Sequence, residues 1–241
     1  MNCFRGAERE GGCRPGSFDR LTIIVAIPST AAQGPLKIVF FGTAELACPS
    51  LAALAENPLC EVVLVATQPD RPKGRELKLQ PSPVKSEAVR RNLPVLQPER
   101  ARDPVFGKAL ADLQPALIVV AAYGQILPSS ILDLPTHGCV NVHASLLPKY
   151  RGAAPIQWAI LNDESETGVT IMKMDPGLDT GDILSQRATA IQAADNAQSV
   201  HDRLARMGAE LLLRTIPEYI GGRIVPRKQP QESASYARKT R

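Results

Sequence analysis

The sequence has few aromatic residues and no cysteines spaced for metal binding. Aromatic side chains make up 4% of its 241 residues, with a single Trp, so we do not expect a surface that stacks nucleic-acid bases. None of the five cysteines forms a C-x-x-C pair, and no Cys/His cluster has the spacing of a zinc site. We therefore expect free thiols in a reducing, cytoplasmic compartment and no metal. The cysteines are Cys3, Cys13, Cys48, Cys60 and Cys139.

Two further absences exclude membrane and dinucleotide functions. No apolar run approaches the length that a membrane span needs. Gly42 follows an apolar segment, but the G-x-G-x-x-G pattern of a dinucleotide-binding loop is absent. A hydrophobic content of 44% with 22% charged residues is ordinary for a globular domain, so the chain is expected to fold around a core.

The net charge of +4 is concentrated in two segments. Residues 71–85 carry five basic side chains against one acidic side chain, Glu76. Residues 223–241 carry six against one, Glu232. Because local patches of one sign attract polyanions, these two segments are the candidates for contact with a nucleic-acid backbone.

Strand and helix patterns alternate after residue 35, and residues 1–35 are predicted to be a disordered extension. The strands are near-continuous apolar runs, which are typical of a parallel sheet buried on both faces. We therefore predict an α/β catalytic domain over 36–222, with a Rossmann-like, doubly wound, mostly parallel sheet flanked by helices. The predicted strands are 37–41, 61–67, 95–96, 116–122, 139–143, 169–174 and 183–190. The predicted helices are 46–56, 84–92, 104–113, a segment around 157–160, and 199–220 with Ser199 as N-cap.

The strand 139–143 carries the candidate chemistry. Side chains two apart on a strand share a face, so Asn141 and His143 point the same way, as does Cys139. An amide donor and an imidazole at the end of a strand could stabilise an oxyanion and accept a proton, which suits acyl-type transfer. Taken alone, the pair could equally satisfy local hydrogen bonds in a buried strand. A nucleophilic role for Cys139 is open, but a packing role is favoured.

Several motifs resemble one enzyme family. They include Asn141-x-His143-x-Ser145-Leu146-Leu147-Pro148, Arg151-Gly152-Ala153-Ala154-Pro155-Ile156 and Arg71-Pro72-x-Gly74-Arg75, with further matching segments at 81–85, 122–128, 167–172 and 177–181. Over roughly residues 36–225 the chain resembles the 10-formyltetrahydrofolate-dependent formyltransferases and, among them, the methionyl-tRNA formyltransferases. The resemblance implies formyl transfer, without a metal, to the amino group of methionine on initiator tRNA, for translation initiation.

The resemblance also assigns roles to residues. Asn141 would stabilise the oxyanion, His143 would accept the amine's proton, and Asp179 would orient the imidazole. The turn from Ser145 through Leu146 and Leu147 to Pro148 would lie against tetrahydrofolate. The cationic loop would enter the acceptor stem of the tRNA through four residues: Arg71, Lys73, Arg75 and Lys78.

Residues 223–241 are predicted to be a basic linker whose C-terminal domain is missing. Relatives of this kind continue into such a domain, so we expect a complete formyl-transfer site, weakened tRNA affinity and a monomeric enzyme. Two alternatives remain open at this stage. One is a folate-dependent transferase or hydrolase that acts on a small acceptor, and the other is a remnant that binds folate or tRNA without turnover.

Overall fold

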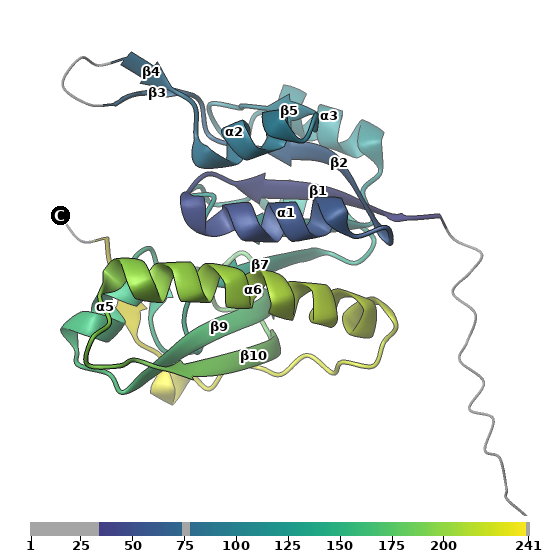
Figure 1. Ribbon diagram of the computed structural model, residues 1–241. Helices are drawn as coiled ribbons and strands as arrows, with labels where there is room; N and C mark the ends of the chain where they lie inside the picture. Colours follow the sequence, from purple (N-terminus) through teal and green to yellow (C-terminus); the bar gives the residue numbers. More distant parts are fainter. Residues whose placement is uncertain (1–33, 74–77, 240–241) are drawn as a thin grey trace, which may run out of the picture. The chain divides into compact units, whose positions relative to one another are not determined.

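The computed structural model describes residues 34–73 and 78–239, and a seven-stranded sheet is its centre (Figure 1). The strand order is β10-β9-β7-β6-β1-β2-β5. The seven strands are β1 (Leu36–Gly42), β2 (Cys60–Ala66), β5 (Val95–Leu96), β6 (Leu117–Ala121), β7 (Cys139–His143), β9 (Glu166–Lys173) and β10 (Ile183–Ala190). The helices are α1 (Cys48–Glu56), α2 (Pro83–Arg90), α3 (Pro104–Leu113), α4 (Ser129–Leu132), α5 (Pro155–Leu161) and α6 (Ala197–Ile220), with short 3-10 turns η1 (Glu45–Ala47) and η2 (Gln231–Ser233).

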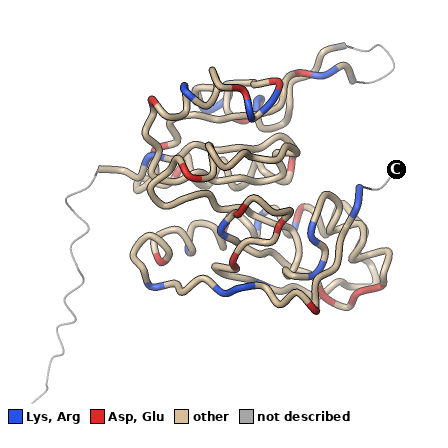
Figure 2. The backbone as a smooth tube through the Cα atoms, turned by 180° about the vertical axis from the view of Figure 1, so that it is seen from behind, with Lys and Arg blue, Asp and Glu red and all other residues tan. Residues whose placement is uncertain are grey.

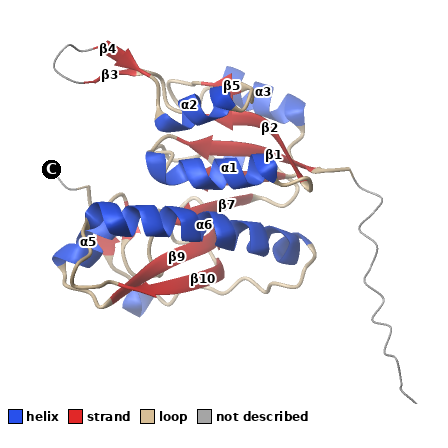
Figure 3. Ribbon diagram, in the orientation of Figure 1, coloured by secondary structure: helices blue, strands red, loops and turns tan. Residues whose placement is uncertain are grey.

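Both faces of the sheet are buried, as the continuous apolar strands predict. In β1 the side chains of Ile38 and Phe40 pack on one face and those of Val39 and Phe41 on the other, and all four are fully buried. Figures 1 and 3 show α1 and α6 side by side over one face, where they contact each other. Helices α3 and α4 supply Phe106 and other apolar side chains to the opposite face.

The predicted mostly parallel, Rossmann-like sheet is confirmed. Strands β5, β2, β1, β6 and β7 run parallel, while β9 pairs antiparallel with β7 and β10 antiparallel with β9. This order brings the carboxyl ends of β1, β6 and β7 to one edge of the sheet. Ligands of such sheets bind at that edge, so a functional site is expected there.

The long helix α6 starts two residues earlier than the sequence indicates. Ser199 was expected as its N-cap, but Asn196 occupies that position and accepts hydrogen bonds from the backbone of Gln198 and Ser199. Ser199 lies at the third helical position, where its hydroxyl accepts from the backbone N–H of Asn196. The prediction was wrong because both residues are good caps, and their reciprocal bonds form one capping box. Of the helices described, none is both long and apolar enough to cross a membrane.

The predicted loop 68–83 contains an antiparallel hairpin of β3 (Arg71–Lys73) and β4 (Lys78–Gln80). Its base is fixed to the body by Asp70, whose carboxylate accepts hydrogen bonds from Lys85 Nζ at 2.6 Å and Gln97 Nε2 at 2.7 Å. Pro72 stands within β3, and a Pro inside a run argues against a strand, so sequence patterns do not reveal so short a pairing. The hairpin extends beyond the body in Figure 1.

Residues 223–239 pack against the domain rather than standing apart from it. Arg227 bridges to Ile183 at the start of β10. Strand β11 (Tyr236–Ala237) pairs in parallel with β8 (Arg151–Gly152), and Ala237 is fully buried. The domain limits of 36–222 and the linker role of 223–241 in a longer protein stay predictions. The extension predicted over 1–35 falls almost wholly outside the described residues.

Candidate active site

A cleft of about 560 Å³ opens at the carboxyl ends of β1, β6 and β7. Its walls come mainly from the segments 122–127, 152–157 and 174–179. Apolar side chains form most of the lining, and a few polar groups converge on it. Small-molecule sites have this composition and this size, so the cleft is the candidate substrate site. The polar lining side chains are Gln125, Asn141, His143, Gln157, Asp175, Asp179 and His201.

The structure brings Asn141, His143 and Asp179 together in this cleft. Asn141 Nδ2 donates to Asp179 Oδ1 at 3.3 Å, and His143 Nδ1 lies 3.7 Å from Asp179 Oδ2. The side chains of His143 and Asp179 are 7% and 15% exposed. Because a charged carboxylate is largely shielded from water here, its field acts on both neighbours with little screening.

The imidazole of His143 is held from its other side by the backbone. Its Nε2 lies 2.9 Å from the carbonyl oxygen of Tyr150. Since a carbonyl oxygen can only accept, Nε2 carries the proton of this hydrogen bond. In the neutral imidazole, Nδ1 then faces Asp179 with its lone pair, and a proton added there forms an imidazolium beside a carboxylate.

The loop that carries Asp179 has a strained and tightly closed backbone. Asp179 itself has φ +52°, a left-handed conformation that few residues other than glycine adopt. Asp175 closes the preceding turn, since its Oδ1 accepts from Gly177 N at 3.1 Å and Thr180 Oγ1 at 2.7 Å. A side chain at Gly181 would overlap the carbonyl of Lys173. Strain of this kind persists where surrounding bonds hold a functional geometry.

The turn Ser145–Pro148, which is predicted to contact folate, lies next to the cleft, but the structure does not bring its side chains into it. Ser145 Oγ donates to the carbonyl of Lys149 at 2.6 Å, and Leu147 packs with Met172 and Ile183. Leu146 is half-buried against Gly168, and Pro148 is half-buried beyond it. A folate contact by Ser145–Pro148 therefore stays a prediction, and the backbone would have to make it.

Cys139 lies on the same strand face as Asn141 but outside the cleft. Its thiol is buried and donates weakly to the carbonyls of Ile131 and Leu132 at 3.7 Å. Burial raises the pKa of the Cys139 thiol to about 12, so it stays protonated near neutral pH. This geometry is that of a packing residue, and it leaves no accessible thiolate for nucleophilic attack.

Three of the four cationic residues predicted to bind tRNA lie in the hairpin strands β3 and β4. Arg71 is exposed on β3, the backbone of Lys73 pairs with that of Lys78, and Arg75 lies outside the described residues. Figure 2 shows basic positions on the hairpin and near the C-terminal end of the described chain, and both segments lie at the same side of the view. Gln68 Nε2 bonds the carbonyl of Tyr123, a cleft residue, and so joins the base of the hairpin to the cleft wall.

Sequence reasoning missed several residues of the cleft. His201 of α6 was not among the predicted site residues, yet it lines the cleft, with Nδ1 2.9 Å from Asp202 Oδ1. Ile126 and Leu178 are 79% and 54% exposed at the cleft, where they present apolar surface. Ile126 and Leu178 lie within the matching segments 122–128 and 177–181, but no local pattern shows that they meet His201, because the three come from distant segments of the chain.

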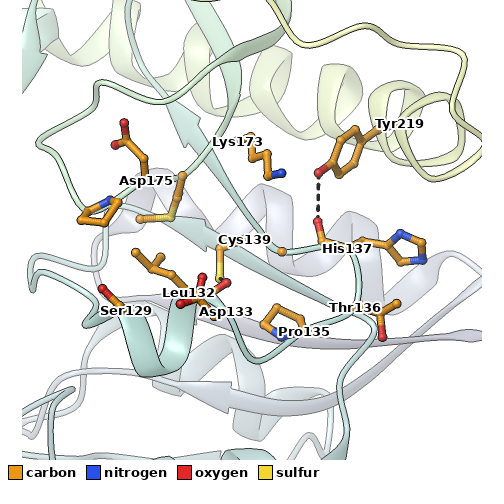
Figure 4. A pocket seen from close by; sticks show the side chains of 13 residues that line it. Ser129, Leu132, Asp133, Pro135, Thr136, His137, Cys139, Lys173, Asp175 and Tyr219 are labelled. Atoms are coloured by element: carbon orange, nitrogen blue, oxygen red, sulfur yellow. Dashed lines mark hydrogen bonds between the residues drawn. The ribbon is translucent and has the colours of Figure 1, made fainter.

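A second cavity of about 540 Å³ lies at the start of β7, away from the predicted catalytic residues (Figure 4). Lys173, Asp133 and His137 line it, and Tyr219 of α6 donates to the carbonyl of His137 at 3.0 Å. It shares the segment 174–176 with the first cleft. In the described part of the chain, no three His, Cys, Asp or Glu side chains cluster as a metal site would require.

Comparisons of sequence place this chain among formyl-transferring proteins. A family model described as "Formyl transferase" matches residues 36–216. A methionyl-tRNA formyltransferase of Caldanaerobacter subterraneus subsp. tengcongensis is 54% identical over 203 residues, which is 84% of this chain and 65% of that protein. One of Geobacter sulfurreducens is 53% identical over 202 residues, covering 84% and 63%. The chain thus spans less than two thirds of the length of these curated relatives.

Solved structures agree in fold. Glycinamide ribonucleotide transformylase 1 of Symbiobacterium toebii superposes with a TM-score of 0.66 at 20% identity, over 82% of this chain and 96% of that one. An N-formyltransferase of Helicobacter canadensis, solved with folinic acid and dTDP-3-aminofucose, gives 0.63 at 24% identity, over 85% and 71%. At these identities the likeness is one of fold alone.

Proposed function

The chain belongs to the formyl transferase family, and on that premise we propose that it transfers the formyl group of 10-formyltetrahydrofolate to the amino group of methionine on initiator tRNA. The observation that carries the proposal is the meeting of Asn141, His143 and Asp179 in one cleft. The tRNA as acceptor rests on the two curated relatives, which match 84% of this chain. We place the activity in the cytoplasm, which fits the free thiols of Cys48 and Cys60.

The cleft fits the folate in size and character. Its volume of about 560 Å³ and apolar walls suit an aromatic ring system, and its polar groups would fix the orientation. When bound, the folate supplies an activated formyl group on its N10. We propose that the cleft holds this group next to Asn141 and His143 and keeps water away from it.

Asn141 would stabilise the charge that develops on the formyl oxygen. Its amide has two N–H groups, and only one is directed at Asp179. The other N–H is free to donate to the oxygen when the amine lone pair bonds to the formyl carbon and the C=O pair moves onto that oxygen. An amide fixed before the reaction needs no reorganisation at that moment, which makes such donors effective.

His143 would take the proton that the attacking amine must lose. Nδ1 accepts it, Asp179 stabilises the imidazolium, and the Tyr150 carbonyl keeps the ring in place. The imidazolium then returns a proton to N10 as the bond between the formyl carbon and N10 breaks and its electron pair stays on nitrogen. The products are the formylated amine and tetrahydrofolate, so atoms and charge balance.

The proposal is tested with charged initiator tRNA, 10-formyltetrahydrofolate and purified chain at low salt. Wild type should form formylmethionyl-tRNA, and His143→Ala should lose roughly 10² to 10⁴-fold in rate. His137→Ala is the matched control, because His137 lines the other cavity, and it should change the rate by less than about twofold. If His143→Ala keeps more than about a third of the rate, the imidazole does not move the proton and the proposal fails.

A further inference from the structure

The segment that follows α6 contacts the back of the Asp179 loop. Gln229 lies beyond residue 216, where the family match ends, and is 6% exposed. Its Nε2 donates to the carbonyl of Asp179 at 2.9 Å and to the carbonyl of Gly181 at 2.7 Å. One side-chain amide thus bonds the loop backbone on both sides of Thr180.

A buried arginine fixes the orientation of this amide. Arg151 is fully buried, and its Nε and Nη2 donate to Gln229 Oε1 at 3.0 and 2.8 Å. Its Nη1 donates to Gln231 Oε1 at 3.1 Å, and none of the ion pairs found in the described residues includes it. Turning the Gln229 amide over would place its NH₂ group against the guanidinium. Burying the Arg151 cation without a carboxylate partner costs folding free energy. An arrangement in which this arginine orients Gln229 therefore calls for a compensating role.

The same C-terminal segment also supports the carboxylate of Asp179. Strand β11 pairs with β8, and the carbonyl of Ala237 accepts from the backbone N–H of Ala153 at 2.9 Å. This pairing fixes Gly152, whose N–H donates to Asp179 Oδ2 at 2.8 Å. The segment 229–237 therefore holds Asp179 at its backbone through Gln229 and at its carboxylate through Gly152.

We propose that Gln229, oriented by Arg151, is a positioning residue that holds Asp179 in register with His143 and Asn141. The left-handed backbone of Asp179 needs such support, because a strained residue keeps its conformation only where its surroundings impose it. This inference rests on the proposed function, in which Asp179 orients the imidazole. It adds that the catalytic unit extends to residue 237, past the matched family range.

Gln229→Glu is the variant that isolates this role. The carboxylate keeps the shape and the acceptor for Arg151, but it loses both N–H donors and directs an oxygen at the two loop carbonyls. We expect kcat to fall roughly 10 to 100-fold, with KM for both substrates within about twofold, because displacing a catalytic group affects the transition state more than binding. Lys228→Ala, an exposed neighbour, is the control and should match wild type.

A double-mutant cycle separates positioning from general destabilisation. In an Asp179→Ala background, Gln229→Glu should cost less than about twofold further, because its effect is transmitted through Asp179. An equal loss in both backgrounds would overturn the proposal.

A second measurement does not depend on the reaction. Amide hydrogen exchange of residues 175–182 should be faster in Gln229→Glu than in wild type and unchanged in Lys228→Ala. If wild type gives no transfer, the proposed function fails and exchange alone decides whether Gln229 positions the loop. Unchanged exchange in Gln229→Glu would refute the positioning role.

Discussion

Replacing Asn141 by alanine should reduce kcat for formyl transfer by roughly 10² to 10³-fold, or about 2.7 to 4 kcal/mol of transition-state stabilisation. The amide is 8% exposed, and its Nδ2 is tied to Asp179 at 3.3 Å, so its second N–H is fixed before substrate arrives. Alanine removes both N–H groups. Because the lost interaction forms only as charge develops on oxygen, KM for the folate should stay within about twofold.

Stability should change far less than activity in Asn141→Ala. The bond to Asp179 is long, and a bond of this kind contributes about 0.5 to 1.5 kcal/mol to folding. Asn141→Asp provides the comparison, since it has the shape of asparagine but places two carboxylates 3.3 Å apart. With an effective dielectric constant of about 20, their repulsion is about 5 kcal/mol, which exceeds the loss of the donor.

The rates should therefore fall in the order wild type, Asn141→Ala, Asn141→Asp. Initial rates at varied folate concentration, with thermal melts of each variant, give kcat, KM and stability together. If Asn141→Ala keeps more than about a third of kcat, or Asn141→Asp is the more active variant, the amide is not the oxyanion donor.

Three further predictions concern the support of the site and the fold. Gly152→Ala should lower the free energy of unfolding by about 1 to 3 kcal/mol in urea titrations, because the backbone φ at this position is +108° and the new Cβ would lie 3.0 Å from the Ala237 carbonyl oxygen. The control is Gly107→Ala in α3, which has open space around it and should be neutral or stabilising. Because burial raises the pKa of the Cys139 thiol to about 12, peptide mass spectrometry should find it unmodified by iodoacetamide at pH 8 until the protein unfolds; fast native labelling would contradict its packing role. The Arg203 guanidinium, with hydrogen bonds from Gln192 N and Ser199, holds the pKa of Asp195 below its ordinary 3.8, so the ionised carboxylate stabilises the fold above that pH and this contribution is lost on acidification. The melting temperature of Asp195→Asn should therefore lie below that of wild type at pH 7, and the difference should shrink as the pH falls below 3.8. A difference that stays constant with pH would refute the ionic contribution.

The sheet could be predicted from sequence because its strands are buried on both faces. Strands 139–143 and 183–190 have the bounds that their apolar and alternating patterns indicate. Strands β8 and β11 could not be found, since two residues each carry no periodicity and the paired residues, Arg151 and Tyr236, are 85 positions apart in the chain. The start of α6 was misplaced because Asn196 and Ser199 both have the side chains of a cap.

The candidate site could be predicted only in part. Strand alternation places Asn141 and His143 on one face, and the structure brings both to the cleft. Asp179 came from the family resemblance, because nothing local shows that a residue 38 positions beyond Asn141 will contact it. Gln229 could not be predicted for the same reason. It is one amide in a basic segment, and only tertiary packing determines which groups it contacts. The side chains of Ser145 and Leu147 turn inward, which a motif cannot show.

The most direct test of formyl transfer by this cleft is the stoichiometry of the reaction. Formylmethionyl-tRNA and tetrahydrofolate should be measured together, with labelled formyl donor, wild-type chain and charged initiator tRNA. The account predicts that one formylmethionyl-tRNA forms for each folate consumed, and that omission of the tRNA stops folate consumption. Folate consumption with release of formate in the absence of tRNA, or equal transfer to a small amine acceptor, would contradict it.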